Sequence, residues 1–145
     1  MNSEEIISYL PYGAPFLFVD KIISVDATSI TGTFRFDESL DFYKGHFKEK
    51  PLTPGVILTE TMAQIGVVSL GIYLVKTEGG DLQNMQIALT SSEVDFYKPV
   101  FPSETVTVKS TQEYFRFSKL KCCVEMFNEK EELVCRGKIA GMIKS

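Results

Sequence analysis

Tryptophan is absent from this 145-residue chain, histidine occurs once, and cysteine occurs three times. An odd number of cysteines, two of them adjacent at Cys122 and Cys123, does not form the paired framework of a small secreted disulfide protein. One histidine and three cysteines also supply too few ligands for a Cys/His zinc site. We therefore expect reduced cysteines in core or surface positions, with no metal and no cofactor.

An excess of basic charge is also missing. The chain has 15 Lys and Arg residues against 19 Asp and Glu residues, and its formal net charge is -4. Proteins that bind nucleic acid neutralise phosphates with a basic surface, so nucleic acid is not expected as the main partner. A length of 145 residues with 44% hydrophobic residues is typical of one globular domain. We expect a single domain over residues 1–145.

The chain has no long apolar run free of polar residues. Its longest apolar stretch, Val56–Val75, is interrupted by Thr59, Glu60, Thr61 and Gln64. Those groups are costly in hydrocarbon, so the stretch predicts a buried helix and no membrane span. The first residues show no basic region followed by an apolar run, so no secretory signal is expected. These features favour a cytoplasmic location.

Two helices are predicted. The longer one runs from 54 to about 76, with Thr53 as its N-cap and the Gly79-Gly80 pair ending it. Apolar side chains surround nearly its whole circumference, which requires a helix wrapped by protein. A short amphipathic helix is predicted over Ser3–Leu10, with Ser3 as its N-cap.

The remaining segments predict strands that short turns connect. They are rich in β-branched and aromatic residues, and several alternate in polarity. The predicted strands are Phe16–Ile23, Ser29–Phe36, Gln86–Leu89, Glu93–Tyr97, Thr105–Tyr114, Leu120–Asn128 and Leu133–Ile143. One buried helix with many strands implies an α+β fold in which an antiparallel sheet wraps around the helix. The order of the strands does not follow from these patterns.

The only histidine, His46, lies in the loop predicted over Asp37–Thr53, and Glu60 follows fourteen residues later in the apolar helix. An imidazole beside a loop glycine and a carboxyl group on an apolar helix are suited to proton transfer. The plainer alternatives are a loop histidine that bonds only to backbone and a glutamate on an exposed helix flank.

The helical neighbours of Glu60 favour a buried carboxyl group. Three of the four residues at offsets of three and four are apolar, namely Val56, Ile57 and Ala63. Desolvation by such neighbours raises the pKa of a carboxyl group and favours its neutral, proton-donating form. The fourth neighbour, Gln64, lies one turn further on and is predicted to hydrogen-bond Glu60.

Several of these residues recur together in a known pattern. Gly45-His46-Phe47, Pro51, Pro54-Gly55-Val56, Glu60 and Met62-Ala63-Gln64 resemble the central motif of the β-hydroxyacyl-acyl-carrier-protein dehydratases of bacterial fatty-acid synthesis. Leu10-Pro11, Pro15-Phe16-Leu17-Phe18-Val19-Asp20 and Asp95-Phe96-Tyr97-Lys98-Pro99-Val100 resemble its flanking blocks. The resemblance covers nearly the whole chain. Three segments depart from the family pattern: Tyr12-Gly13, Lys48 and Pro102-Ser103-Glu104.

The resemblance implies a hotdog fold and a definite reaction. Such enzymes dehydrate (3R)-hydroxyacyl thioesters on acyl carrier protein to trans-2-enoyl thioesters in fatty-acid, lipid or polyene biosynthesis. It implies His46 as the base for the C2 proton and Glu60 as the acid, or water-orienting group, for the C3 hydroxyl. It also implies an obligate homodimer, often assembled further into a hexamer, in which the histidine of one subunit faces the acidic residue of the other.

Further residues are candidates for binding the substrate. The N–H groups at the start of the long helix, at Gly55 and Val56, are suited to bind a thioester oxygen. The acyl chain needs an apolar channel, for which Phe42, Phe47, Val56 and Phe96 are candidates. Gln64 is a candidate polar residue of the same site. Plain core packing is the alternative for each large apolar residue.

An acidic carrier protein needs a basic docking surface. The candidates are Lys98, Arg116, Lys119 and Lys121, with solvated strand ends as the alternative. Two other functions remain open from the sequence. A thioesterase of the same fold would use an acidic helix residue and water, and a non-catalytic acyl-binding module would use only the channel.

Overall fold

The computed structural model describes residues 1–144, and its central element is one continuous helix from Gly55 to Thr77. The helix consists of α2 (Gly55–Ala63), a π-helical stretch η2 (Gln64–Ser69) and α3 (Leu70–Thr77). Every residue from 61 to 72 is buried. The prediction of a helix wrapped by protein is therefore confirmed.

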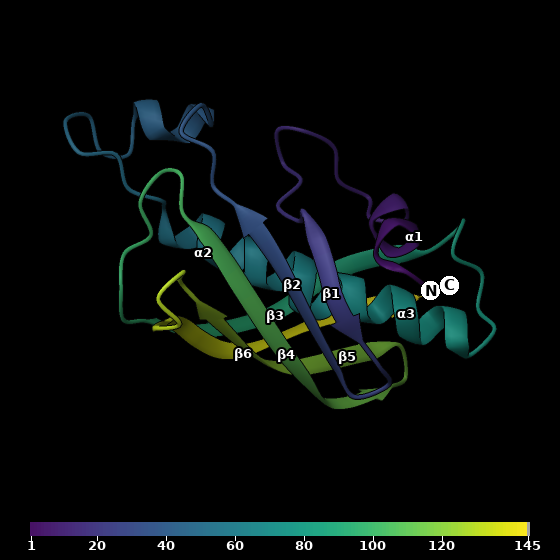
Figure 1. Ribbon diagram of the computed structural model, residues 1–145. Coiled ribbons are helices and arrows are strands. Elements are labelled where there is room, and N and C mark those ends of the chain that lie inside the picture. Colours follow the sequence, from purple (N-terminus) through teal and green to yellow (C-terminus); the bar gives the residue numbers. More distant parts are fainter. Residues whose placement is uncertain (145) are drawn as a thin grey trace.

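One antiparallel sheet of six strands surrounds this helix, as Figure 1 shows. Its strands are β1 (Lys21–Val25), β2 (Ser29–Arg35), β3 (Gln86–Phe96), β4 (Thr105–Arg116), β5 (Lys119–Phe127) and β6 (Leu133–Lys144). They lie in the order β1-β2-β4-β5-β6-β3, so β1 and β3 form the two edges. The α+β wrap predicted from the sequence is confirmed.

The helix and sheet approach each other closely at small residues. A Cβ placed on Gly71 would lie 2.0 Å from Cδ1 of Ile143, so β6 packs directly against α3. Ser110 of β4 is buried and donates a hydrogen bond of 2.8 Å to the Gly66 carbonyl of η2. By length and composition the helix is long and apolar enough to cross a membrane, but 72% of its most apolar window is buried. It has the burial of a core helix.

Three of the predicted strands differ from the structure. The strand predicted over Phe16–Ile23 begins only at Lys21, because the buried side chain of Gln64 binds the Phe16 carbonyl and the Phe18 N–H. Those backbone groups are then not available for a strand ladder. The two strands predicted before and after residue 90 form one strand, β3, whose register shifts between Leu89 and Ser91.

The first helix, α1, spans Ser3–Ser8, and its cap lies one residue earlier than predicted. The Asn2 side chain accepts a hydrogen bond of 2.9 Å from the Glu5 N–H and so caps the helix. The Ser3 hydroxyl instead accepts a hydrogen bond of 2.8 Å from the N–H of Ile22. Ser3 thereby ties α1 to β1.

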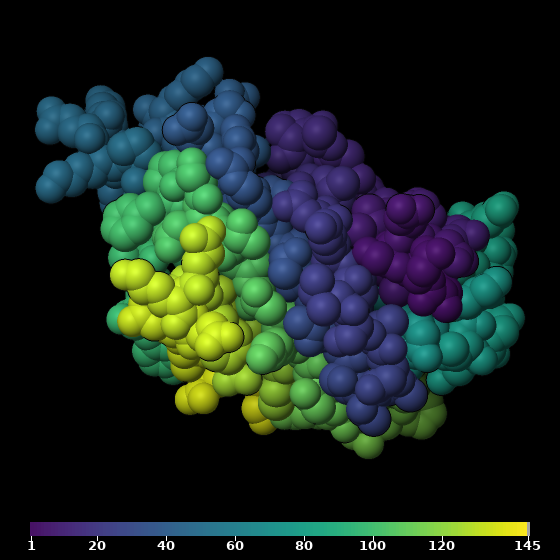
Figure 2. All heavy atoms as spheres, in the orientation of Figure 1, coloured from purple at the N-terminus to yellow at the C-terminus, as the bar shows by residue number. Residues whose placement is uncertain are grey.

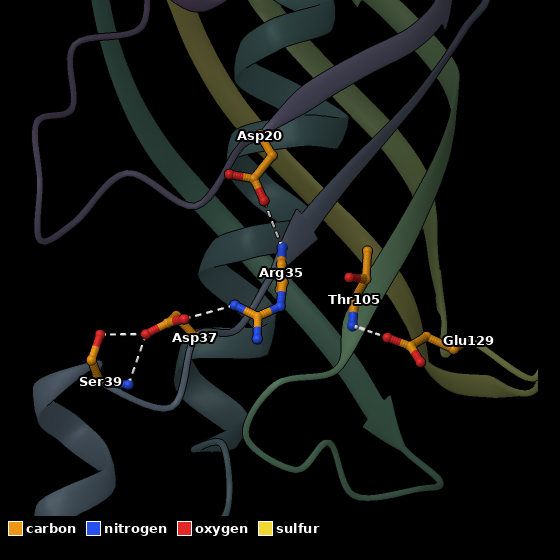
Figure 3. A network of polar contacts seen from close by, with 6 residues as sticks. All are labelled: Asp20, Arg35, Asp37, Ser39, Thr105 and Glu129. Carbon is orange, nitrogen blue, oxygen red and sulfur yellow. Dashed lines mark hydrogen bonds and ion pairs between the residues drawn. The ribbon is translucent and has the colours of Figure 1, made fainter.

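A polar network fixes the chain where it leaves β2 (Figure 3). Asp20 accepts a hydrogen bond of 2.7 Å from the Arg35 N–H, and the Arg35 guanidinium lies 2.6 Å from Asp37. The hydroxyl and backbone N–H of Ser39, together with Arg35, lower the pKa of Asp37 to about 2. The ionised Asp37 thus anchors the start of the long loop that contains His46.

Candidate active site

The loop around His46 projects from the body of the protein, where Figure 2 shows it as a blue to teal lobe. It begins with the short 3-10 helix η1 (Asp41–Lys44). The His46 N–H donates to the Phe42 carbonyl at 3.0 Å, and the Leu52 N–H donates to the His46 carbonyl at 2.8 Å. These bonds fix the backbone of the histidine on both sides.

The ring of His46 is held by a third bond, because its Nδ1 lies 2.8 Å from the Leu52 carbonyl oxygen. A carbonyl oxygen can only accept, so Nδ1 carries the proton and donates it. In the neutral ring Nε2 is then the basic nitrogen. The Phe47 ring stacks on the imidazole, with ring centroids 4.2 Å apart.

A cavity of about 330 Å³ opens beside this imidazole. Its walls come from the histidine loop, the start of α2 and the end of β3. The lining residues are His46, Phe47, Leu52, Thr53, Gly55, Leu58, Phe96, Tyr97, Lys98 and Pro99. Gly55 and Phe47, both predicted from the sequence, thus lie in the same cavity as His46.

The start of α2 lies one residue later than predicted. Pro54 is the N-cap and Gly55 the first helical residue, while the Thr53 hydroxyl is hydrogen-bonded to Tyr43. Thr53 therefore fixes the loop instead of capping the helix. Since Pro54 provides no side-chain cap, the first N–H groups of α2, at Gly55 and Val56, remain available for a ligand.

Glu60 is half-buried on α2, and its pKa is raised because burial disfavours the charged form. Nε2 of Gln64 donates a hydrogen bond of 2.9 Å to Oε2 of Glu60, which partly offsets this rise. Both the predicted hydrogen bond and the predicted direction of the pKa shift are confirmed.

Gln64 joins Glu60 to the N-terminal loop. Its side chain is fully buried, and Oε1 accepts a hydrogen bond of 2.7 Å from the N–H of Phe18. Nε2 also donates a hydrogen bond of 2.9 Å to the Phe16 carbonyl. Because Oε1 must accept from an N–H, the orientation of the amide is fixed, and Nε2 can only donate to Glu60.

Replacing Gln64 with methionine is expected to destabilise the fold by about 2–5 kcal/mol, because the buried N–H of Phe18 and carbonyl of Phe16 lose their partner. The free energy of unfolding from urea titrations measures this loss. The exposed Gln83→Met is the matched control and should change stability by less than about 0.5 kcal/mol. Equal small effects in both variants would refute the structural role of Gln64.

The chain does not bring His46 and Glu60 to one cavity. Glu60 is not among the residues that line the His46 cavity. It neighbours Tyr12, whose pKa is raised to about 12 by burial and, to a smaller extent, by the charge of Glu60. Each chain thus presents the imidazole and the carboxyl group in different surroundings.

The large apolar candidates fall into three groups. Phe47 and Phe96 line the His46 cavity. Val56 is 76% exposed and lines a second cavity of about 520 Å³ between α2 and β3. Phe42 packs against Tyr43, with ring centroids 4.6 Å apart, and lines neither cavity. The role of Phe42 as a channel residue stays a prediction.

Of the four basic candidates, only Lys98 lines the His46 cavity, where it also forms an ion pair of 3.3 Å with Glu132. Arg116 and Lys119 pair with each other in register at the β4–β5 turn. That turn lies at the far end of β4, a strand of 12 residues that is about 40 Å long. Lys121 faces Glu113 on the outer face of the sheet. Of the predicted basic surface, only Lys98 is near the cavity.

Two residues of this region are not indicated by the sequence pattern. The Leu52 carbonyl orients His46, but a role of the backbone leaves no mark in the side-chain pattern. Tyr12 departs from the family pattern, and its place beside Glu60 depends on the Gln64 contacts to the N-terminal loop. Within residues 1–144, no group of three or more His, Cys, Asp or Glu is arranged to hold a metal ion.

Comparisons with known proteins give sequence matches over most of this chain. A family model described as a FabA-like domain matches residues 10–138. A 3-hydroxyacyl-[acyl-carrier-protein] dehydratase FabZ of Ehrlichia canis is 32% identical, over 99% of this chain and 95% of that protein.

Solved structures share the fold at low identity. A chain of the dehydratase heterocomplex ApeI:P from Xenorhabdus doucetiae has a TM-score of 0.80 at 12% identity, covering 97% of this chain and 91% of that one. A thioesterase mutant from Pseudomonas aeruginosa has a TM-score of 0.69 at 12% identity, covering 99% and 94%. At this identity the likeness establishes the fold alone, which is the hotdog arrangement.

Proposed function

This chain belongs to the FabA-like family, and we propose that it dehydrates (3R)-hydroxyacyl thioesters of acyl carrier protein to trans-2-enoyl thioesters. The observation that supports this most directly is the bond from His46 Nδ1 to the Leu52 carbonyl. It leaves Nε2 as the base in a cavity that the start of α2 also lines. We assign the reaction to fatty-acid biosynthesis or a related lipid or polyene pathway.

The first step removes the C2 proton. Nε2 of His46 takes this proton, and the electron pair moves toward the thioester carbonyl oxygen. The free N–H groups at Gly55 and Val56, at the positive end of the α2 dipole, bind the oxygen as negative charge develops on it. Removing one such donor from an enzyme typically lowers its rate about 10²- to 10³-fold.

The second step expels the C3 hydroxyl. Glu60, whose pKa burial raises, donates its proton to this hydroxyl, so the C3–O bond breaks and water leaves as the C2–C3 double bond forms. Since Oε2 accepts from Gln64, the transferred proton resides on Oε1. His46 has then gained one proton and Glu60 has lost one, and a return proton transfer resets the site.

Dimerisation brings the two groups together in this proposal. One chain keeps His46 and Glu60 in separate surroundings, so His46 of one subunit would act with Glu60 of the other. The edge strand β3 supports this arrangement, because it has an unpaired edge, it is largely exposed, and it includes the 45% exposed Leu89. A long exposed edge of this kind is suited to pair with a second copy.

Replacing Leu89 with glutamate is expected to shift the protein from dimer to monomer and to abolish most of the dehydration. A glutamate at this exposed edge would be covered by the second copy without a partner for its charge. Sedimentation velocity measures the assembly. The matched control is Ile23→Glu, because Ile23 is 60% exposed on the opposite edge strand, β1. A fully active monomer would refute a shared active site.

Four further assignments accompany the proposal. Residues 1–145 are taken as one hotdog domain, active in the cytoplasm. Lys98, at the rim of the His46 cavity, is the basic contact for the acidic carrier protein. The dimers can assemble further into a trimer of dimers, as the family resemblance implies.

Product analysis tests the proposed reaction. Purified protein is incubated with 3-hydroxyacyl carrier protein, or with its pantetheine mimic, and the thioester products are separated by mass. We expect an enoyl thioester that is lighter by one water. Release of free thiol without an enoyl product would identify a thioesterase, and saturable acyl binding without turnover would identify a binding module. Either result would overturn the proposed reaction.

A further inference from the structure

Two cavities meet at a single aromatic residue. The His46 cavity of about 330 Å³ and the cavity of about 520 Å³ between α2 and β3 have only Gly55 and Phe96 in common among their lining residues. Phe96 therefore lies at the boundary between the space beside the imidazole and the larger space behind it. Nothing in the proposed proton transfers uses this residue.

The ring of Phe96 faces the first residue of α2. A Cβ placed on Gly55 would lie 3.4 Å from both Cε1 and Cζ of Phe96, so the tip of the ring faces the glycine with space for about one methyl group between them. The ring therefore lies over the first turn of α2 at the point where the two cavities share their lining residues.

The backbone of Phe96 is fixed while its ring keeps freedom to turn. Phe96 pairs with Cys135 at the end of β3, and the next N–H, of Tyr97, donates to the Val134 carbonyl at 2.8 Å. The side chain itself is 49% exposed. A half-exposed ring on a fixed strand end can change rotamer without disturbing the sheet.

The larger cavity has the lining that an acyl tail needs. Ser92, Val94 and Phe96 alternate along β3 and face the same side, opposite Val56 and Thr59 of α2. Three of these five side chains are apolar. The His46 cavity, by contrast, lies at the lower limit of the ~300–1,000 Å³ typical of small-molecule sites.

We propose that Phe96 determines the length of acyl chain that the enzyme accepts, by closing the passage from the His46 cavity to the cavity between α2 and β3. This inference rests on the proposed dehydration. Short 3-hydroxyacyl groups fit beside His46 with the ring over Gly55. Longer tails enter the larger cavity only when the ring has turned away, so their turnover includes the cost of opening it.

Steady-state kinetics with two substrates tests this role. For each variant, kcat/KM is measured with the 3-hydroxybutyryl and the 3-hydroxydecanoyl thioester of the pantetheine mimic. Phe96→Ala is expected to raise the ratio of kcat/KM for the long substrate to kcat/KM for the short one by about 10-fold or more. This is the size of effect that one or more methylenes have in a pocket. Phe96→Trp should lower the same ratio, since a larger ring closes the passage more firmly.

Phe101→Ala is the matched control. Phe101 is 52% exposed, close to the exposure of Phe96, but it lines neither cavity. The ratio of kcat/KM for the long to the short substrate in Phe101→Ala should therefore equal that of the wild type. Circular dichroism and thermal melting establish that each variant is folded. An active Phe96→Ala with an unchanged ratio would overturn the role of Phe96 and leave the dehydration intact. Absence of turnover by the wild type on both substrates would overturn the proposed function itself.

Discussion

His46→Asn is expected to lower kcat/KM for dehydration by about 10²- to 10⁴-fold, the range that general acid–base catalysis contributes. Asparagine can keep the bond to Leu52, because its amide nitrogen donates to the carbonyl much as Nδ1 of the imidazole does. The loop should then keep its shape while the basic Nε2 is lost. The enoyl product, followed over time, measures the effect.

His46→Ala separates the role of His46 as a base from the role of its hydrogen bond to Leu52. It removes both the base and the bond to Leu52, so its activity should be as low as that of His46→Asn, while its thermal stability should be slightly lower. Wild-type turnover in either variant would remove His46 from the mechanism. A loss confined to His46→Ala would assign to His46 a structural role in the loop.

Glu60→Gln is the second change with a large expected effect, again a loss of about 10²- to 10⁴-fold in kcat/KM. The fold should persist, because the new amide oxygen can still accept the bond from Gln64. Glutamine nearly matches the volume and polarity of glutamate but has no acidic proton to donate. Unchanged turnover of Glu60→Gln would exclude Glu60 as the acid.

The pH dependence of stability gives an independent check on the state of Glu60. Burial raises its pKa in the folded protein. Its neutral form therefore favours folding below the ordinary pKa of glutamic acid, and this contribution is lost as the pH rises through the raised value. Glu60→Gln cannot titrate, so its stability relative to the wild type should increase over that interval. Urea titrations across the pH range measure this difference.

Much of the fold could be read from local patterns in the chain. The apolar residues on every side of Gly55–Thr77 require a wrapped helix, and the structure buries that helix as expected. The alternation in Ser29–Phe36 predicts a strand, and the structure contains one over Ser29–Arg35. These predictions hold because side-chain periodicity and burial are properties of neighbouring residues. The order of the strands could not be predicted in this way, since it depends on which strands pair with each other although they lie far apart in the sequence.

Two of the errors share one cause, which is competition for hydrogen-bonding groups from distant residues. Phe16–Asp20 has the composition of a strand, but the Gln64 amide takes the backbone groups of that segment. Thr53 is a suitable N-cap, but its hydroxyl is bonded to Tyr43. A local pattern indicates which conformation a residue favours. It contains no information on which distant residue will form hydrogen bonds with its polar groups.

The sequence by itself determined the helix that contains Glu60 and the hydrogen bond between Glu60 and Gln64, because residues four apart on a helix must be neighbours. The reactive pair of His46 and Glu60 stays a prediction from the sequence. Only the tertiary structure decided that Leu52 orients His46, that Tyr12 lies beside Glu60, and that the ring of Phe96 faces Gly55. Those contacts join segments whose positions depend on the packing of the whole sheet around its helix. No spacing along the chain can specify them.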